Sequence, residues 1–67
     1  METISVVVPC YNEEDVLKSF YTEISKVASE IKNVNFEMLF VDDGSKDKTL
    51  NIIKNYASFD SRVRYIS

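Results

Sequence analysis

The sequence predicts an α/β domain in which strand, helix, strand, helix and strand follow one another along the chain. Three observations lead to this prediction: two runs that are apolar at nearly every position, a long segment between them with apolar side chains at helical spacing, and turn residues between these segments. A crossover of this length joins parallel strands and is right-handed almost without exception. We therefore expect half of a doubly wound parallel sheet, with the strands in the order 3-2-1.

The first strand is predicted at residues 4–8, a β-branched run without a charged residue. Because it is apolar at nearly every position, it is typical of a strand covered on both faces. Pro9 is expected to end it, since proline cannot donate a hydrogen bond to a sheet ladder. In the order 3-2-1 this strand lies at an edge, and an uncharged apolar edge readily pairs with other chains. The sequence therefore predicts self-association through the edge of the first strand.

The first helix is predicted at residues 15–31 from the spacing of its apolar side chains. Steps of three and four place these residues on one stripe of a helix: Val16, Leu17, Phe20, Tyr21, Ile24, Val27, Ala28 and Ile31. Asn12 is expected to be the N-cap residue. The acids Glu13, Glu14 and Asp15 then suit the positive end of the helix dipole.

The second strand is predicted at residues 36–41 and the third at residues 63–66, with a shorter helix between them. The turn at residues 42–45 contains the only glycine of the chain. The helix is indicated by apolar residues at helical spacing: Leu50, Ile52, Ile53, Tyr56 and Ala57. Its cap is expected at Ser45 or Asp47. Most of the larger aromatic side chains are expected in the core: Phe20, Tyr21, Phe36, Phe40, Tyr56 and Phe59.

Composition excludes several classes of function. The chain carries 8 basic and 11 acidic residues, a net charge of −3, so no basic surface for a nucleic acid is expected. No apolar stretch approaches the ~20 residues of a membrane-spanning helix. The single cysteine, Cys10, cannot form an internal disulfide, which favours a reducing, cytoplasmic location. A core this small, without a disulfide or metal, leaves roughly 3–5 kcal/mol of stability, so the chain is expected to be marginally stable, oligomeric or a fragment. Of these, a fragment is favoured, and residues 1–67 are predicted to be a partial domain of a longer protein.

The polar residues after the first two strands are the most informative feature of the sequence. In an open parallel sheet, ligands bind outside the carboxyl ends of the strands. Residues 9–13 and 42–45 both follow predicted strands, and adjacent strands lie about 4.8 Å apart. One edge of the sheet is therefore expected to gather an aromatic ring, three carboxylates and a glycine turn.

Two motifs at this edge give the sequence a specific resemblance. Residues 6–14 read Val-Val-Val-Pro-Cys-Tyr-Asn-Glu-Glu, and residues 39–49 read Leu-Phe-Val-Asp-Asp-Gly-Ser-Lys-Asp-Lys-Thr. Together, and followed by Arg-Val-Arg-Tyr-Ile at residues 62–66, they resemble the opening of family 2 glycosyltransferases, which have the Rossmann-like GT-A fold. The resemblance covers essentially the whole chain. The residues of the two motifs resemble most the branch of the family that moves a sugar from a nucleotide to a polyprenyl phosphate carrier.

The resemblance implies a nucleotide-binding role for six residues: Pro9, Tyr11, Glu13, Val41, Asp42 and Asp43. Pro9 and Tyr11 would shape the site and face the base, with the ring of Tyr11 as a stacking surface. Asp43 would accept the ring N–H of the base, beside a wall formed by Val41.

Glu13 and Asp42 complete this set, and simpler interpretations stay open for both. Glu13 would reach the nucleoside, or serve only as a first-turn acid of the helix. Asp42 would shape the turn beside Asp43, and either acid could act only as a turn cap. Cys10 is expected to be an inert small residue, because no basic residue adjoins it in the sequence.

The whole enzyme implied by the resemblance transfers a glycosyl group from a UDP- or GDP-sugar to an acceptor such as a polyprenyl phosphate. Mg²⁺ or Mn²⁺ would neutralise the leaving diphosphate. In the family, the acidic metal-binding motif, the catalytic base and the acceptor site come after this segment, so the 67-residue chain holds no catalytic or metal residue and is expected to be inactive alone. The parent enzyme would work at the cytoplasmic face of a membrane.

Two other classes of function share features with this sequence. A receiver-like signalling domain also gathers acids at strand ends around Mg²⁺, but it needs them after the first strand, where this chain has Pro-Cys-Tyr. A non-catalytic α/β interaction module would have the same fold and no ligand. Fold alone does not separate that module from an enzyme.

Overall fold

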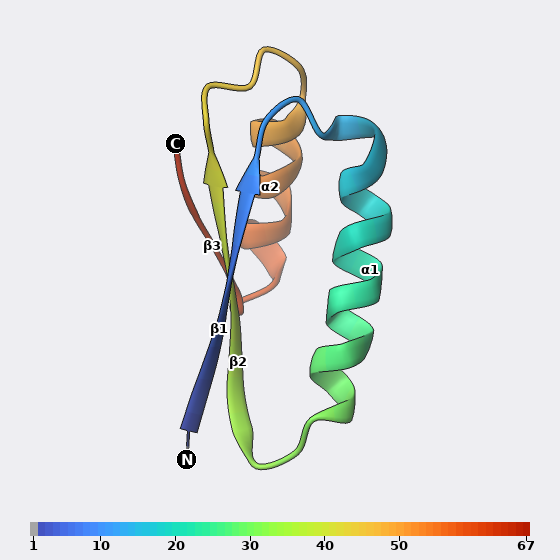
Figure 1. Ribbon diagram of the computed structural model, residues 1–67, viewed down its shortest axis with the longest axis vertical. Helices are drawn as coiled ribbons and strands as arrows, with labels where there is room; N and C mark the ends of the chain where they lie inside the picture. Colours follow the sequence, from blue (N-terminus) through green and yellow to red (C-terminus); the bar gives the residue numbers. More distant parts are fainter. Residues whose placement is uncertain (1) are drawn as a thin grey trace.

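The computed structural model describes residues 2–67, and its elements follow the predicted order (Figure 1). They are β1 (Glu2–Cys10), α1 (Glu14–Glu30), β2 (Val34–Asp42), α2 (Thr49–Phe59) and β3 (Val63–Ile66). All three strands are parallel, and β2 lies between β1 and β3. The predicted βαβαβ unit with strand order 3-2-1 is confirmed.

Both helices lie on the same side of the sheet (Figure 1). Each crossover moves the chain one strand further in the same direction, from β1 to β2 and then to β3. Crossovers of one hand then place their helices on one face, which gives a layer of helices over a layer of strands. Neither α1 nor α2 combines the length and the apolar character that a bilayer-spanning helix needs.

The hydrophobic core fills the space between the sheet and the helices. Its buried members come from all five elements: Cys10, Leu17, Met38, Phe40, Ile53, Tyr56 and Val63. Met38 and Phe40 of β2 have no exposed surface, because alternate residues of a strand point to the same face. Tyr21 of α1 stacks on Tyr56 of α2 with the ring centroids 3.9 Å apart, which joins the two helices.

The opposite face of the sheet has no helix over it in the part of the chain that the structure describes (Figure 1). Strand alternation places Val7, Leu39 and Ile66 on this face, and Val7 and Ile66 are 60% and 56% exposed. From the apolar strands we expected a sheet that is covered on both faces. Residues 2–67 cover only one of these faces.

The prediction that Pro9 ends the first strand is wrong, because β1 continues to Cys10. The carbonyl of Cys10 accepts a hydrogen bond from Asp43 at 2.9 Å, so Cys10 directs its backbone groups toward β2. Pro9, one residue earlier, directs its own toward the open edge of the sheet. No ladder donor is needed there, and the proline is therefore tolerated inside the strand.

The prediction that Asn12 caps the first helix is also wrong. Helix α1 begins at Glu14, and its N-cap residue is Glu13, whose side chain makes no capping hydrogen bond. Asn12 instead has a φ of 51°, in the left-handed region that asparagine adopts more readily than most residues. The first-turn acids Glu14 and Asp15 are present as expected.

The remaining differences concern boundaries and two aromatic side chains. Strand β2 begins at Val34, earlier than predicted, because Asn33 turns the chain with a φ of 64°. Helix α2 begins at Thr49, after the turn predicted to cap it. Phe59 is 64% exposed and Phe20 is 37% exposed, so neither belongs to the buried core in residues 2–67.

Candidate functional site

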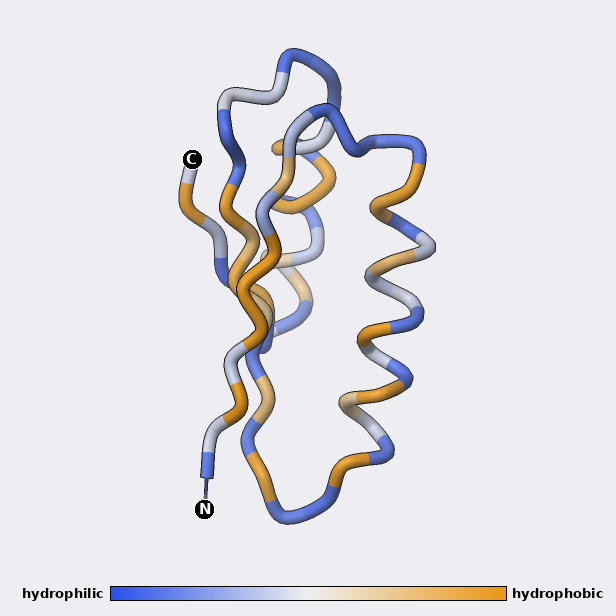
Figure 2. The backbone as a smooth tube through the Cα atoms, in the orientation of Figure 1, coloured by the Kyte–Doolittle hydropathy of each residue, from blue (hydrophilic) through white to orange (hydrophobic). Residues whose placement is uncertain are grey.

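The carboxyl ends of β1 and β2 lead into two loops that lie side by side (Figure 1). We call this edge the rim and define it as residues 9–13 and 41–49. The backbone N–H of Asp43 donates to the carbonyl of Cys10 at 2.9 Å, which extends the pairing of the strands into the loops. Both loops are polar, whereas the strands that lead into them are apolar (Figure 2). The structure thus brings together the two segments that the sequence placed at one edge.

Asn12 joins the first loop of the rim to the second. Its backbone N–H donates to the Ser45 hydroxyl at 3.0 Å. Its side-chain carbonyl accepts the backbone N–H of Lys46 at 2.9 Å. Sequence reasoning missed this role, although a short amide side chain in a loop is a signal for local bonds to the backbone.

Asp42 shapes the second loop. Its side chain is buried, and its carboxylate accepts hydrogen bonds from the backbone N–H of Ser45 at 3.2 Å and from the Ser45 hydroxyl. Gly44, between them, has a φ of 74°, a conformation that glycine adopts without strain. The carboxylate of Asp42 is therefore engaged within its own loop.

Asp47 receives hydrogen bonds from the first residues of both helices. Its Oδ2 accepts the backbone N–H of Glu14 at 3.2 Å. Its Oδ1 accepts the backbone N–H of Thr49 at 2.9 Å and the Thr49 hydroxyl at 2.5 Å. Desolvation acts to raise the pKa of Asp47, but these hydrogen bonds outweigh it and hold the pKa below its usual range. The N-cap residue of α2 is Lys48 and not the predicted Ser45 or Asp47. Asp47, one residue earlier, nevertheless accepts the first backbone N–H of α2, and it accepts that of α1 as well.

The residues predicted to bind a nucleotide take two orientations. Pro9 and Val41 lie opposite each other in neighbouring strands, on the sheet face without a helix. Tyr11, which is 52% exposed, and Asp43, which is also exposed, follow in the two loops. Asp42 points to the helix side, where it is buried. The rim therefore exposes the side chains of Tyr11 and Asp43 to solvent and keeps that of Asp42 inside.

Glu13 is half-buried and lines a hollow of about 180 Å³ between β1 and α1. The other lining residues are mostly apolar and include Pro9, Cys10 and Phe20. Burial, followed by the charges of Glu13 and Asp42, raises the pKa of the Cys10 thiol. Cys10 is thus a buried core residue whose thiol ionises less readily than usual, which agrees with the inert role expected from its sequence context.

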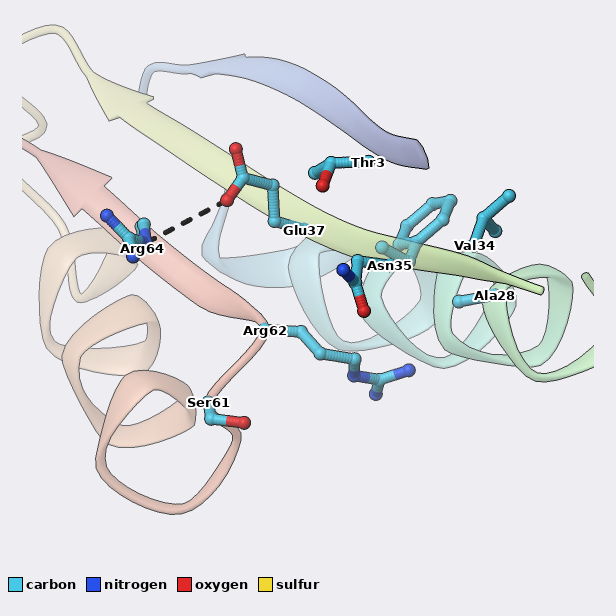
Figure 3. Close-up of a pocket in the computed structure, with 9 residues that line it drawn as sticks. Thr3, Ala28, Val34, Asn35, Glu37, Ser61, Arg62 and Arg64 are labelled. Carbon is cyan, nitrogen blue, oxygen red and sulfur yellow. Dashed lines mark ion pairs between the residues drawn. The ribbon is translucent and has the colours of Figure 1, made fainter. Parts of the chain in front are cut away.

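A larger hollow of about 530 Å³ lies at the opposite end of the sheet (Figure 3). It contains Arg62 and Arg64, but both cations already have carboxylate partners. Arg64 lies 3.9 Å from Glu37, and Arg62 lies 2.8 Å from Asp60. This hollow is remote from the strand ends where parallel sheets bind ligands, so we place the candidate site at the rim.

The rim lacks the ligands of a divalent metal site. Nowhere in residues 2–67 do three His, Cys, Asp or Glu side chains gather closely enough to hold a metal ion. The oxygen atoms of Asp42 are engaged by Ser45, and hard cations such as Mg²⁺ require several oxygen ligands. The described residues therefore do not fit the Mg²⁺ or Mn²⁺ site of a glycosyltransferase.

The fold and the rim define a Rossmann-like parallel α/β domain with its polar site at the carboxyl ends of β1 and β2. A profile of glycosyl transferase family 2 matches residues 5–67, and the chain belongs to this family. The resemblance carried by the two motifs is confirmed.

Curated relatives agree with this assignment. An uncharacterized glycosyltransferase of Bacillus subtilis, YkcC, is 44% identical over 62 residues, which are 92% of this chain and 19% of the relative. A prophage bactoprenol glucosyl transferase homolog of Escherichia coli and a bactoprenol glucosyl transferase of Shigella phage SfX are each 42% identical over 60 residues, which are 90% of this chain and 19% of the relative. The chain thus spans about a fifth of the length of these relatives. No solved structure matches it.

Proposed function

We propose that the rim is the nucleoside-binding part of the donor site of a glycosyltransferase that uses a UDP- or GDP-sugar. The observation that carries this proposal is the hydrogen bond from Asp43 to the Cys10 carbonyl, which brings the loop of Tyr11 against the loop of Asp43. An exposed aromatic ring and an exposed carboxylate then share one sheet edge. Ligands of open parallel sheets bind at such an edge.

The chemistry of a nucleobase suits these groups. The ring of Tyr11 offers a flat surface on which a base stacks, while the carboxylate of Asp43 accepts the ring N–H that uracil and guanine both carry. Pro9 and Val41 form an apolar wall beneath them. Glu13 reaches the nucleoside from the neighbouring hollow. Asp42 contributes by holding the loop of Asp43 in shape.

The reaction of the whole enzyme is part of the same proposal. It transfers a glycosyl group to a polyprenyl phosphate at the cytoplasmic face of a membrane, which is supported by relatives named bactoprenol glucosyl transferase. The unpaired Cys10 accords with a cytoplasmic setting. Mg²⁺ or Mn²⁺ in the whole enzyme would be held by residues other than 2–67 and would supply positive charge beside the diphosphate of the donor.

Self-association of the isolated chain through β1 also belongs to this proposal. Strand β1 is an edge strand of the described sheet, and its Val7 and Ile4 are 60% and 37% exposed. An apolar edge of this kind pairs with a second copy unless something covers it.

The test is calorimetric titration of the full-length protein with UDP and GDP. Asp43→Asn should weaken the better ligand by roughly 1–3 kcal/mol, because a charged acceptor for the ring N–H is lost. Asp15→Asn is the matched control, since it removes the same charge from an exposed residue in the first turn of α1. Equal affinities of wild type and Asp43→Asn, or binding of neither nucleotide, would overturn the proposal.

A further inference from the structure

Asp47 lies between the N-terminal ends of two helices that start 35 residues apart in the sequence, at Glu14 and Thr49. Neither helix has a side-chain cap from its own N-cap residue, which is Glu13 in α1 and Lys48 in α2. The carboxylate of Asp47 supplies the missing hydrogen-bond acceptor at both helix ends: Oδ2 accepts the backbone N–H of Glu14, and Oδ1 accepts that of Thr49. One side chain therefore satisfies backbone donors at both helix ends.

Three further hydrogen bonds join the same two loops. The Thr49 hydroxyl, which donates to Asp47 within the second loop at 2.5 Å, accepts the backbone N–H of Glu13 in the first loop at 2.8 Å. Asn12 adds its two bonds to Ser45 and Lys46. Tyr11 directly precedes this network in the first loop, and Asp43 lies shortly before it in the second.

We propose that Asp47 is a positioning residue for nucleotide binding, because it sets the distance between the loop that carries Tyr11 and the loop that carries Asp43. This inference rests on the proposed function of the rim. Asp47 does not touch the ligand. It acts through the first turns of α1 and α2, which it joins at the rim.

The partners of Asp47 explain why it acts on the site more than on the fold. All of them belong to the first turns of α1 and α2, whereas the core that unites helices and sheet is built from residues such as Phe40 and Ile53. Loss of Asp47 should therefore loosen the rim and leave the core packed. A loosened rim must be ordered when the nucleotide binds, and that ordering lowers the affinity.

Asp47→Asn is the informative substitution, studied in the full-length protein. The amide keeps one acceptor oxygen, so one of the two helix ends loses its partner. The Kd for UDP or GDP, whichever binds wild type, should rise roughly tenfold, the size of one hydrogen bond to a charged group. Asp15→Asn, which removes the same charge from the first turn of α1, should leave the Kd unchanged.

A double-mutant cycle separates positioning from general stability. If Asp47 acts by placing Asp43, then Asp43→Asn should weaken binding less in the Asp47→Asn background than in wild type. A residue that only stabilised the fold would leave the effect of Asp43→Asn the same in both backgrounds. An unchanged Kd in Asp47→Asn, or two effects that simply multiply, overturns this inference and leaves the proposed function standing.

Asn12→Gly provides the same test without touching Asp47, in case Asp47→Asn does not fold. Glycine accepts the φ of 51° at this position and removes only the side-chain bond to Lys46. The Kd of Asn12→Gly should also rise, and Asp43→Asn should weaken binding less in this background than in wild type. An unchanged Kd would show that the spacing of the two loops does not control affinity, and it would overturn the inference. Failure of wild type to bind either nucleotide is a different result, since it removes the proposed function together with this inference.

Discussion

Arg62 binds both carboxylate oxygens of Asp60, with Nη2 at 2.8 Å from Oδ2 and Nε at 3.0 Å from Oδ1. The Tyr21 hydroxyl donates to the same Oδ2 at 2.5 Å, so Asp60 ties α1 to the loop between α2 and β3. The Arg62 guanidinium, and with it the Tyr21 hydroxyl, hold the pKa of Asp60 well below its usual range despite partial burial.

The depressed pKa of Asp60 predicts a loss of stability in acid. The contribution of ionised Asp60 to the free energy of unfolding is fully present above about pH 4, the pKa of this side chain in the unfolded chain. It is lost as the pH falls toward the lower pKa of Asp60 in the folded protein. Hydrogen bonding to Asp60 raises the pKa of Arg62, and burial raises that of Tyr21, so neither loses its proton in this window. Asp60→Asn should cost about 1–2 kcal/mol at pH 7. In thermal unfolding from pH 7 to pH 2, the gap between wild type and variant should close below pH about 4; a constant gap would contradict this account.

Tyr11 should contribute to nucleotide affinity and little to stability. Its side chain is 52% exposed, so Tyr11→Ala removes little buried surface. Loss of a stacking ring should weaken UDP or GDP binding by roughly 1–3 kcal/mol. Tyr11→Phe keeps the ring and should bind like wild type. Calorimetry and thermal unfolding of both variants in the full-length protein check this, and equal affinities for the alanine and phenylalanine variants would exclude stacking.

The 67-residue chain should show no glycosyl transfer by itself. Within residues 2–67 no three His, Cys, Asp or Glu side chains gather closely enough to hold the divalent metal of the proposed reaction. The measurement is transfer of labelled glucose from UDP-glucose to a polyprenyl phosphate with Mn²⁺ present, and the full-length protein serves as the positive control. Turnover by the purified chain would show that the catalytic groups lie among the described residues after all.

The isolated chain should self-associate through β1. Val7→Lys should reduce this association, because a charged side chain on an edge strand discourages pairing. Thr22→Lys adds the same charge to an exposed position on α1 and should not change it. Sedimentation at micromolar concentration measures the effect. A wild-type chain that sediments as a compact monomer would rule out an open edge at β1.

Periodicity predicted the order and type of every element, because apolar spacing records which residues face the core. The spacing that placed α1 at residues 15–31 agrees closely with Glu14–Glu30. The predictions for Pro9 and Asn12 are wrong because local preferences do not include the partners that each residue has in the folded chain. Pro9 is tolerated because its backbone faces an open edge. Asn12 does not cap the helix because it forms hydrogen bonds with Ser45 and Lys46, more than thirty residues away in the sequence.

The same limit applies to the candidate site. Strand order alone placed Tyr11 and Asp43 at one edge, and the structure brings their loops together. The shared use of Asp47 was not predictable, since its bond to Glu14 exists only after the sheet has formed. The spacing of Ser45, Asp47 and Thr49 signals a helix start, and it says nothing about a second helix.

Pro9 also limits how the sheet can grow. Its backbone faces the open edge of β1, where an added strand would seek donors, yet its nitrogen carries no hydrogen. A second copy that pairs with β1 would therefore receive no backbone hydrogen bond from Pro9, near the end of the strand. Hydrogen-bonded pairing with the second copy could extend along residues 3–7 but would be interrupted at Pro9, beside the rim. The loss of this donor favours an intermolecular sheet that ends before the two loops of the rim.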